Sequence, residues 1–434
     1  MRLQIKRILS VFLCVCVLSV FSGCDIFNTA EMFYHEPDLT ASKMKASVFA
    51  SENTVFPDEY FTDISEYVHL PARDFYCYGK LNSLQKTVYN LIYSQACNLD
   101  ISNMYFYGAS EKDVMLAYYA VCADNPQLFW LGDWFISEFR ESENKTVLSL
   151  SGTAAGGFMQ NRELVDSKSS EMYSAICDIF SKIITPDMSK YQMELAVHDW
   201  LCDKVTYNEE AAADDTVVKE DNFDNWTAYG AIVNRSAVCE GYAEAFQLMM
   251  YYLGINCTVI IGDEHMWNAV ELDDGWYYVD ATWDDSKTGR LEYNHSFFNA
   301  DEKIMESSHE KYFVPDENTS AEELRYGSFN LFCEECTSTQ FNYYRKEGRF
   351  IEKRSRFGMV VTPVLQRAWN GQRAVSEFAF GYCEADPDYV LSVCDSSGVT
   401  DDMLDHTNNA LMHGSMTAYD LGSYGAFAVQ YDIK

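Results

Sequence analysis

The stretch from residue 239 to residue 282 constrains the fold more than any other part of this 434-residue chain. Its first segment carries apolar side chains at helical spacing and ends before Gly254, a residue that readily adopts the left-handed conformation closing many helices. Three runs typical of strands follow, at 257–261, 265–272 and 276–282. An Asp-Gly pair between the last two predicts a tight antiparallel hairpin. We therefore predict an α+β unit with one helix packed on an antiparallel sheet.

Cys239 stands at the predicted start of this helix, in the sequence AVCEGYA. The first amides of a helix have no backbone partners, and the positive end of the helix dipole favours a thiolate over a thiol. The same amides can stabilise an oxyanion that develops on a substrate carbonyl. Gly241, two residues later, would let the helix start approach a neighbouring segment closely. This placement predicts that Cys239 is a nucleophile.

His265 begins the following strand and is the candidate base. An imidazolium there would stabilise the thiolate and later protonate a leaving amine. With the turn centred on the Asp-Gly pair, the residue opposite His265 falls near position 284. Asp280, Asp284 and Asp285 all lie within the uncertainty of this register, and each could orient the imidazole. Geometry from the sequence does not choose among the three.

Three segments resemble the core motifs of the transglutaminase-like superfamily. They are AYGAIVNRSAVCEGYAEAF (228–246), GDEHMWNAVEL (262–272) and WYYVDATWDD (276–285). The resemblance implies a papain-like core, in which a helix bearing the cysteine packs on an antiparallel sheet. It also implies acyl transfer through a thioester. This chemistry requires no cofactor, and we assign no metal-binding residues.

The same resemblance assigns the third member of the site. The family places its catalytic aspartate in a Val-Asp-x-Thr-Trp segment, which selects Asp280 as the partner of Cys239 and His265. Ala281 stands where proline is usual, and Met266 stands where alanine is common. Neither departure replaces a residue of the triad.

The first residues are typical of a bacterial lipoprotein signal. A basic start at 1–7 precedes an apolar run at 8–21 that is short for a membrane span, and Ser22-Gly23 stands directly before Cys24. The resemblance to a lipobox, with Phe21 where leucine is usual, implies cleavage before Cys24 and a diacylglycerol on its sulfur. We therefore expect an extracytoplasmic protein, lipid-anchored to the cell membrane.

The charge of the chain limits its partners. A formal net charge of −34 repels phosphate backbones, so we expect no nucleic-acid partner. The expected partners are a protein or peptide substrate, with cell-wall peptide as one candidate, and the membrane through the N-terminal lipid; the oligomeric state is unknown. The acids between Asp214 and Asp224 form no EF-hand pattern and are interpreted as a solvated loop.

The pattern along the chain predicts five parts. These are a signal peptide (1–23), a tether and N-terminal arm (24–80), a mainly helical α+β region (81–185), the catalytic core (186–320) and a C-terminal α+β domain (325–434). The flanking helices are expected at 81–97, 110–123, 163–184 and 188–205. The flanking strands are expected at 129–138, 145–151, 340–344, 349–351, 359–362, 376–381 and 426–432.

The cysteines add one argument. The chain has 14 cysteines, and an odd number remains after the two in the signal peptide and Cys24 are set aside. One thiol would then be unpaired, and Cys239 is the candidate. Cys333 and Cys336 form a CxxC pair without a second pair or histidines at zinc spacing, so they are interpreted as a structural pair or two unlinked thiols.

Other candidate residues receive plainer interpretations. His198 falls on an apolar helical stripe and is expected to be a buried, hydrogen-bonded histidine. His406 and His413 have no partners at metal-binding spacing and are assigned to the surface. Trp226 and Tyr229 are weak candidates for a side chain that completes the oxyanion site.

The function predicted from these observations is that of an extracytoplasmic thiol enzyme acting on peptide or amide bonds. Hydrolysis, as in a cysteine peptidase or amidase, is favoured over cross-linking. The alternative is a cell-surface binding or scaffold lipoprotein that retains the fold without turnover. A scaffold has no physical need for cysteine, histidine and aspartate together, which favours the enzyme.

Overall fold

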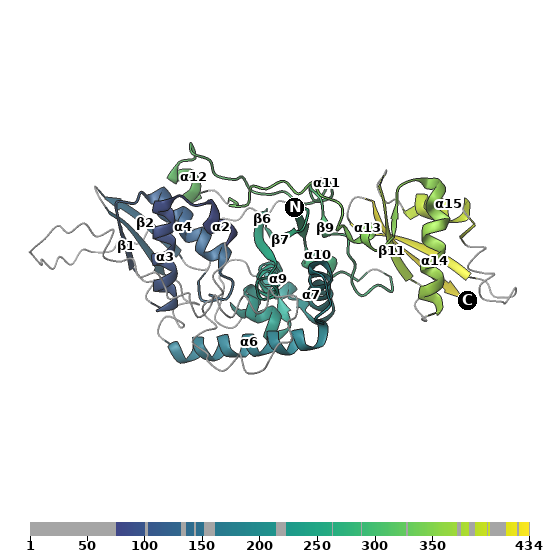
Figure 1. Cartoon of the computed structure of the whole chain (residues 1–434), viewed down its shortest axis with the longest axis horizontal. Coiled ribbons are helices and arrows are strands. Elements are labelled where there is room, and N and C mark those ends of the chain that lie inside the picture. Colours follow the sequence, from purple (N-terminus) through teal and green to yellow (C-terminus); the bar gives the residue numbers. More distant parts are fainter. Residues whose placement is uncertain are drawn as a thin grey trace, which may run out of the picture. The chain divides into compact units, whose positions relative to one another are not determined.

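A computed structural model of the chain describes most residues from Phe75 onward (Figure 1). The described residues are 75–99, 103–131, 136–142, 145–151, 161–213, 223–262, 264–287, 289–326, 329–370, 375–381, 387–396, 398–399, 414–422 and 425–433. The predicted signal peptide, Cys24, the tether up to residue 74, the acidic segment 214–222, His406 and His413 lie outside them. Within the part so described, no helix is both long and apolar enough to cross a bilayer.

The first described part combines helices with a three-stranded sheet. Its helices are α2 (Tyr76–Lys80), α3 (Ser83–Cys97), α4 (Glu111–Asp124) and α6 (Arg162–Ile183). Its strands β1 (Asn103–Tyr107), β2 (Ile136–Ser142) and β3 (Lys145–Ser151) pair antiparallel in the order β1-β3-β2. The predicted start of α4 is confirmed, because the Ser110 and Asp113 side chains each accept the other's backbone N–H.

The structure of this half of the chain differs from the sequence predictions at three points. The strand expected from residue 129 begins only at residue 136, and Phe129 and Trp130 are instead buried core residues outside it. The sequence does not predict β1. The acidic composition of residues 211–226 predicts an exposed loop, but Ala211 and Phe223 in this segment are buried.

The central part is a helix packed on a four-stranded antiparallel sheet, which confirms the α+β prediction (Figure 1). The sheet order is β6 (Asn256–Gly262), β7 (His265–Leu272), β8 (Gly275–Val279) and β9 (Phe298–Ala300). The packed helix is α9 (Cys239–Leu253), which also contacts α7 (Lys190–Lys204). The smaller elements of this central part of the chain are β4 (Thr206–Tyr207), α8 (Glu209–Ala213), η3 (Phe223–Trp226), η4 (Gly230–Asn234), β5 (Ser236–Ala237), α10 (Ala281–Asp284), α11 (Glu302–Met305) and α12 (Ala321–Tyr326).

Helix α9 follows its sequence pattern closely. It begins at Cys239 and ends at Leu253, and Gly254 closes it with φ 81°, as predicted. Tyr242, Phe246 and the other apolar residues of the predicted inner face are buried. A helix so fully covered can hold its first residue, Cys239, in a fixed place against the sheet.

The hairpin between β7 and β8 turns one residue earlier than predicted. Leu272 pairs with Gly275, so the loop consists of residues 273–274. Gly275 is needed at the start of β8 for a different reason: its φ is 146°, and a Cβ there would lie 2.9 Å from Ser338 Oγ. The glycine thus accommodates a segment distant in sequence rather than the turn itself.

This shift changes the position of the aspartates. Moving the centre of a hairpin by one residue moves each cross-strand partner by two, so the position opposite His265 becomes 282 rather than 284. Strand β8 has already ended at Val279. Asp280, Asp284 and Asp285 therefore lie at the start, at the end and just after α10, and not on a strand.

The last part is a second four-stranded sheet with two longer helices. Its order is β10 (Phe350–Ile351), β11 (Val375–Phe380), β13 (Ala426–Ile433) and β12 (Gly414–Asp420). Its helices are α13 (Tyr343–Lys346), η5 (Arg354–Arg356), α14 (Phe357–Asn370) and α15 (Pro387–Ser396). The boundaries of the predicted domains stay predictions.

Two expected strands in this part are wrong. Residues 359–362 belong to α14, where buried Phe357, Val361 and Val364 recur at helical spacing. Residues 340–344 lead into α13. Short apolar runs fit a buried helix face as well as a strand, so periodicity alone could not separate the two.

The described cysteines change the argument from counting. No disulfide joins any of the described cysteines, Cys239 included, so an odd number does not single it out. Cys333 is exposed and Cys336 is buried, which leaves the CxxC pair as two unlinked thiols. The assignment of Cys239 therefore depends on its surroundings.

Candidate active site

Cys239 is half-buried at the first position of α9. The residue before it, Val238, makes no side-chain hydrogen bond to the first amides of the helix. The preceding segment is fixed by β5 and by the Val238 amide, which donates to the Asn225 carbonyl at 2.8 Å. Helix and strand together hold the thiol where an anion is stabilised by the helix dipole.

His265 and Asp280 meet beside this helix start. His265 is the first residue of β7, and its Nε2 lies 2.6 Å from Asp280 Oδ2. Cys239 is among the groups that raise the pKa of His265, and the His265 ring stacks on Trp267. The structure thus brings the three predicted residues into one connected group, and their catalytic roles stay predictions.

The Asp280 carboxylate is buried and fully engaged. It caps α10, because Oδ1 accepts the backbone N–H groups of Thr282 at 2.9 Å and Trp283 at 3.1 Å. Its other oxygen accepts from His265 and from His309, the latter at 2.9 Å. A carboxylate held by four donors has little freedom, so it fixes the orientation of the His265 ring.

Electrostatics favour a charged histidine in this group. Burial alone would lower the pKa of His265, but the Asp280 carboxylate and the Cys239 contact outweigh burial and raise the pKa to about 10. Burial alone would raise the pKa of Asp280, but His265 and His309 hold it well below its usual range. The pair is therefore an imidazolium facing a carboxylate at neutral pH, ready to stabilise a thiolate.

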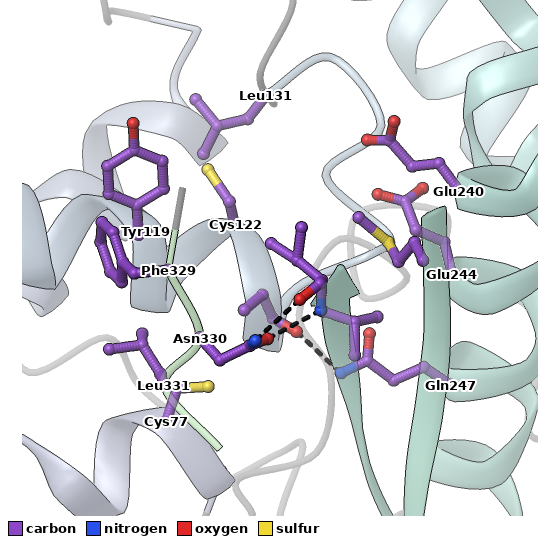
Figure 2. A pocket seen from close by; sticks show the side chains of 14 residues that line it. Cys77, Tyr119, Cys122, Leu131, Glu240, Glu244, Gln247, Phe329, Asn330 and Leu331 are labelled. Carbon is purple, nitrogen blue, oxygen red and sulfur yellow. Dashed lines mark hydrogen bonds between the residues drawn. The ribbon is translucent and has the colours of Figure 1, made fainter. Parts of the chain in front are cut away.

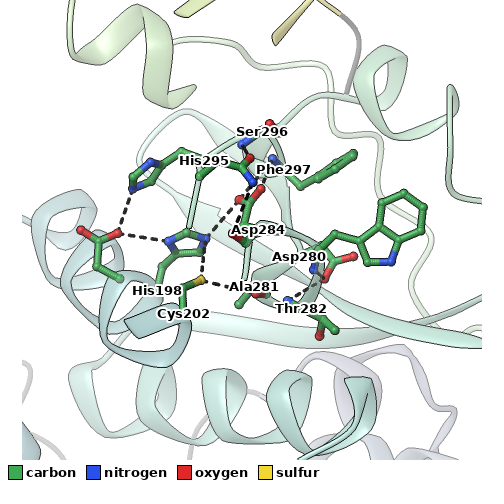
Figure 3. A network of polar contacts seen from close by, with 12 residues as sticks. His198, Cys202, Asp280, Ala281, Thr282, Asp284, His295, Ser296 and Phe297 are labelled. Carbon is green, nitrogen blue, oxygen red and sulfur yellow. Dashed lines mark hydrogen bonds and ion pairs between the residues drawn. The ribbon is translucent and has the colours of Figure 1, made fainter. Parts of the chain in front are cut away.

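The structure also separates Asp280 from the two alternatives. Asp284 Oδ2 lies 3.1 Å from Nε2 of His198, a buried histidine as predicted (Figure 3). Asp285 accepts a hydrogen bond from the Tyr242 hydroxyl at 2.5 Å. Asp280 alone of the three contacts His265. The residue that the resemblance selects is thus the one that the geometry selects.

His309 is a residue of the site that the sequence does not reveal. Its Nδ1 lies 2.9 Å from Ser308 Oγ, which can donate to it, so Nε2 carries the proton donated to Asp280. The following residues pair with the end of β6, because Tyr312 N–H donates to the Ile261 carbonyl. That pairing places His309 beside the turn before His265, a contact between segments with no spacing pattern.

We expect His309 to act as a positioning residue. His309→Ala removes one charge-assisted donor from Asp280 and should lower kcat/KM by about 10-fold. His309→Gln keeps an N–H donor and should recover most of this loss. The pH dependence of kcat/KM should change in the alanine variant alone. Equal losses in both variants, with an unchanged pH profile, would indicate a role in packing only.

Gly241 provides the close approach that the sequence predicts. A Cβ at this position would lie 2.7 Å from the Asn225 carbonyl oxygen and 2.9 Å from that of Thr227. Both are backbone atoms, so Gly241→Ala must displace the start of α9 and should cost about 1–3 kcal/mol of stability. Urea unfolding measures this loss. Gly79→Ala, whose Cβ would meet nothing within 4 Å, should cost nothing, and an equal loss in both would contradict the steric argument.

The two candidate oxyanion donors, Trp226 and Tyr229, differ in whether their donor group already has a hydrogen-bond partner. The Tyr229 hydroxyl donates to Glu171 at 2.7 Å, so it is already used. The Trp226 indole Nε1 is buried and has no partner among the described residues. Trp226 ends η3, next to Asn225, whose carbonyl holds the segment before Cys239. Trp226 is therefore the better candidate.

A pocket opens between α4, α9 and the end of β6 (Figure 2). It encloses about 660 Å³ of empty space, part of it open to solvent, between α4, α9 and β6. Glu240 and Met266, the residues that follow Cys239 and His265, both line it. Its opposite wall is apolar and includes Leu131 and Phe329.

Comparison with known proteins supports the same region. Residues 178–281 match the family model of the transglutaminase-like superfamily. Kyphoscoliosis peptidase of Mus musculus is 24% identical over 139 residues, covering 28% of this chain and 20% of the relative. The Homo sapiens protein of that name is 23% identical over 143 residues, covering 29% and 21%. The chain thus spans about a fifth of the length of these relatives.

Two solved structures are weakly similar. A transglutaminase crystal structure is 13% identical, with a TM-score of 0.26, and the match covers 50% of this chain and 59% of the other. A candidate cysteine protease from Cytophaga hutchinsonii is also 13% identical, with a TM-score of 0.21 and coverage of 34% and 62%.

The matched segment contains Cys239, His265 and Asp280 and ends before Asp284. The match to the transglutaminase-like superfamily is thus confined to residues 178–281, and members of that superfamily are cysteine-dependent enzymes.

Proposed function

We propose that this protein is a thiol hydrolase that cleaves peptide or amide bonds through a thioester on Cys239. The observation that carries the proposal is the connected group of Cys239, His265 and Asp280 at the start of a buried helix. Such a group activates a thiol as a nucleophile. A scaffold protein would have no use for it.

The reaction follows from the positions of the groups. The Cys239 thiolate attacks the substrate carbonyl carbon, and the helix amides with Trp226 Nε1 stabilise the oxyanion. The carbon–nitrogen bond breaks as the His265 imidazolium protonates the leaving amine. Water then attacks the thioester while His265 takes its proton. The products are a carboxylic acid and the restored thiol.

Water is the proposed acceptor of the acyl group. The curated relatives carry the name peptidase, which favours hydrolysis. The pocket of Figure 2 would suit an apolar side chain of the substrate, since most of its lining is apolar. We propose peptides, with cell-wall peptides as one candidate class, as substrates.

The setting is part of the proposal. Residues 1–24 support export and a lipid anchor on Cys24, which would place the enzyme outside the cytoplasm on the cell membrane. Labelling with a radioactive fatty acid in a bacterial host tests this directly. Label in the wild type that is lost in Cys24→Ala supports the anchor, and label in neither protein contradicts it.

One experiment tests the chemistry. The full chain is incubated with a peptide library, with and without a primary amine, and the products are analysed by mass spectrometry. Hydrolysis predicts new carboxyl termini whether or not the amine is present. Amine conjugates as the main product would overturn hydrolysis in favour of cross-linking. Absence of products and of any acyl-enzyme would favour the scaffold alternative.

A further inference from the structure

A second group of histidines and carboxylates lies apart from the candidate triad and shares no residue with it (Figure 3). His198 and Asp199 are consecutive on α7, and His295 precedes β9. Asp199 Oδ1 lies 3.2 Å from His198 Nδ1 and 2.9 Å from His295 Nε2. One carboxylate oxygen thus faces a ring nitrogen from each histidine.

The second nitrogen of each ring faces another carboxylate. His198 Nε2 lies 3.1 Å from Asp284 Oδ2, and His295 Nδ1 lies 2.6 Å from Glu377 Oε1 on β11. Both histidines and both of these acids are buried. Metal-binding histidines are commonly oriented in this way, with one nitrogen on the ion and the other donating to a carboxylate.

Hydrogen bonds alone would be a costly way to hold this group together. The Asp199 oxygen can accept a hydrogen bond only from a ring nitrogen that carries a proton. Because the second nitrogen of each ring also faces a carboxylate, His198 and His295 would each need protons on both nitrogens. Two imidazolium ions would then be buried, and desolvating each is expensive. A single divalent cation between the three atoms carries the same charge as the two protons it would replace. The histidines could then be neutral, each with its proton on the nitrogen facing Asp284 or Glu377.

We propose that His198, Asp199 and His295 bind a divalent transition-metal ion of the zinc class. The three ligand atoms lie within 4.8 Å of one another, close enough for a common ion. Two imidazole nitrogens and one carboxylate oxygen suit Zn²⁺ or Co²⁺ better than Mg²⁺ or Ca²⁺, which prefer oxygen. The Asp199 side chain is 35% exposed, which gives the ion and a water ligand a route from solvent.

The position of this site indicates a structural role. It would join α7 to the segment before β9, and Glu377 would connect it to the C-terminal sheet through His295. Cys202 does not belong to the ligand set, because its thiol lies on the Nε2 side of His198 and donates to the Ala281 carbonyl. The ion would fasten the catalytic core to the sheet that follows it, independently of the proposed hydrolase activity.

Metal binding by the full chain is the first test. The Cys239→Ser variant serves as the background, because it removes the thiol of the candidate active site as a ligand. The protein is treated with a chelator, loaded with Zn²⁺, gel-filtered and analysed by mass spectrometry for metal content. We expect one zinc per chain and a melting temperature raised by about 3–5 °C at saturating Zn²⁺. Zinc content near zero would overturn the proposal.

Substitutions then locate the ion. Asp199→Asn keeps the shape of the ligand and should abolish binding. Glu377→Gln changes only the support of His295 and should weaken binding by about 10–100-fold. His309→Gln is the matched control, since His265, Asp280 and His309 form another compact group of potential ligands. It should leave zinc binding intact.

The zinc content of these variants distinguishes the proposed site from the candidate active site. Zinc lost in His309→Gln and retained in Asp199→Asn would place the ion at the candidate active site and overturn the proposal. Unchanged affinity in Glu377→Gln would contradict the carboxylate-supported geometry. The far-ultraviolet circular dichroism spectrum of Asp199→Asn should match that of the Cys239→Ser background. A match would show that the substitution removes zinc binding without unfolding the protein. Peptide cleavage is measured separately in chains that keep Cys239, and its absence there would bear on the proposed function alone.

Discussion

Replacing Cys239 by alanine should abolish turnover, lowering kcat/KM by about 10⁴-fold or more. The nucleophile has no substitute in the group, because His265 and Asp280 act only through the thiol. What remains is binding and oxyanion stabilisation, which accelerate the reaction far less than the complete group. Cleavage of a peptide found in the library experiment measures the change.

The control is a second accessible cysteine. Cys333 is exposed and lies on the CxxC segment, so Cys333→Ala should leave kcat/KM within about twofold. Iodoacetamide near neutral pH should modify Cys239 faster than Cys333, because the helix start and His265 favour its thiolate. Full activity of Cys239→Ala would refute the proposed mechanism and return the scaffold alternative to first place.

The second large effect is expected from Asp280→Asn. The carboxylate is the main group that raises the pKa of His265 against the effect of burial. Without the negative charge, burial dominates and the pKa of His265 falls. We expect kcat/KM at neutral pH to drop by about 10²–10⁴-fold, because the imidazolium that stabilises the thiolate and protonates the leaving amine is lost.

The direction of the pH dependence distinguishes this cause from a damaged fold. In the wild type the imidazolium persists up to a pKa of about 10, so the alkaline limb of kcat/KM should lie near pH 10. In Asp280→Asn it should move toward neutral pH. Asp285→Asn is the matched control, since Asp285 contacts Tyr242 and not His265, and its alkaline limb should stay in place. An unmoved limb in Asp280→Asn would show that the carboxylate does not set the charge of His265.

Much of the catalytic core could be predicted because its signals are local. Apolar spacing and Gly254 fix α9 within one stretch of chain, and both ends of this helix are confirmed. The Asp-Gly pair predicts the hairpin, although its centre is misplaced by one residue. At the start of β8 the chain also meets Ser338, which approaches Gly275 from a distant segment and which no local pattern reports.

The C-terminal region shows where local signals fail. Residues 359–362 are apolar enough for a strand, and only packing against the second sheet makes them part of α14. A short buried run carries no periodicity that separates the two structures. Whether such a segment becomes a helix or a strand depends on the surface against which it packs.

The candidate active site also combines features that the sequence predicts with features that only the tertiary structure shows. By itself the sequence determines a thiol at a helix start, a histidine at the start of a strand and three aspartates within reach. Only the tertiary structure decides that Asp280 faces His265, while Asp284 and Asp285 turn to His198 and Tyr242.

His309 and the group around Asp199 are likewise products of the tertiary structure. His309 reaches Asp280 because its segment pairs with the end of β6, and Glu377 reaches His295 from the second sheet. Helices, caps and turns follow from interactions over a few residues, which the order of residues encodes directly. Partners of a charged side chain depend on which distant elements are packed against it, and that is settled only when the chain is folded.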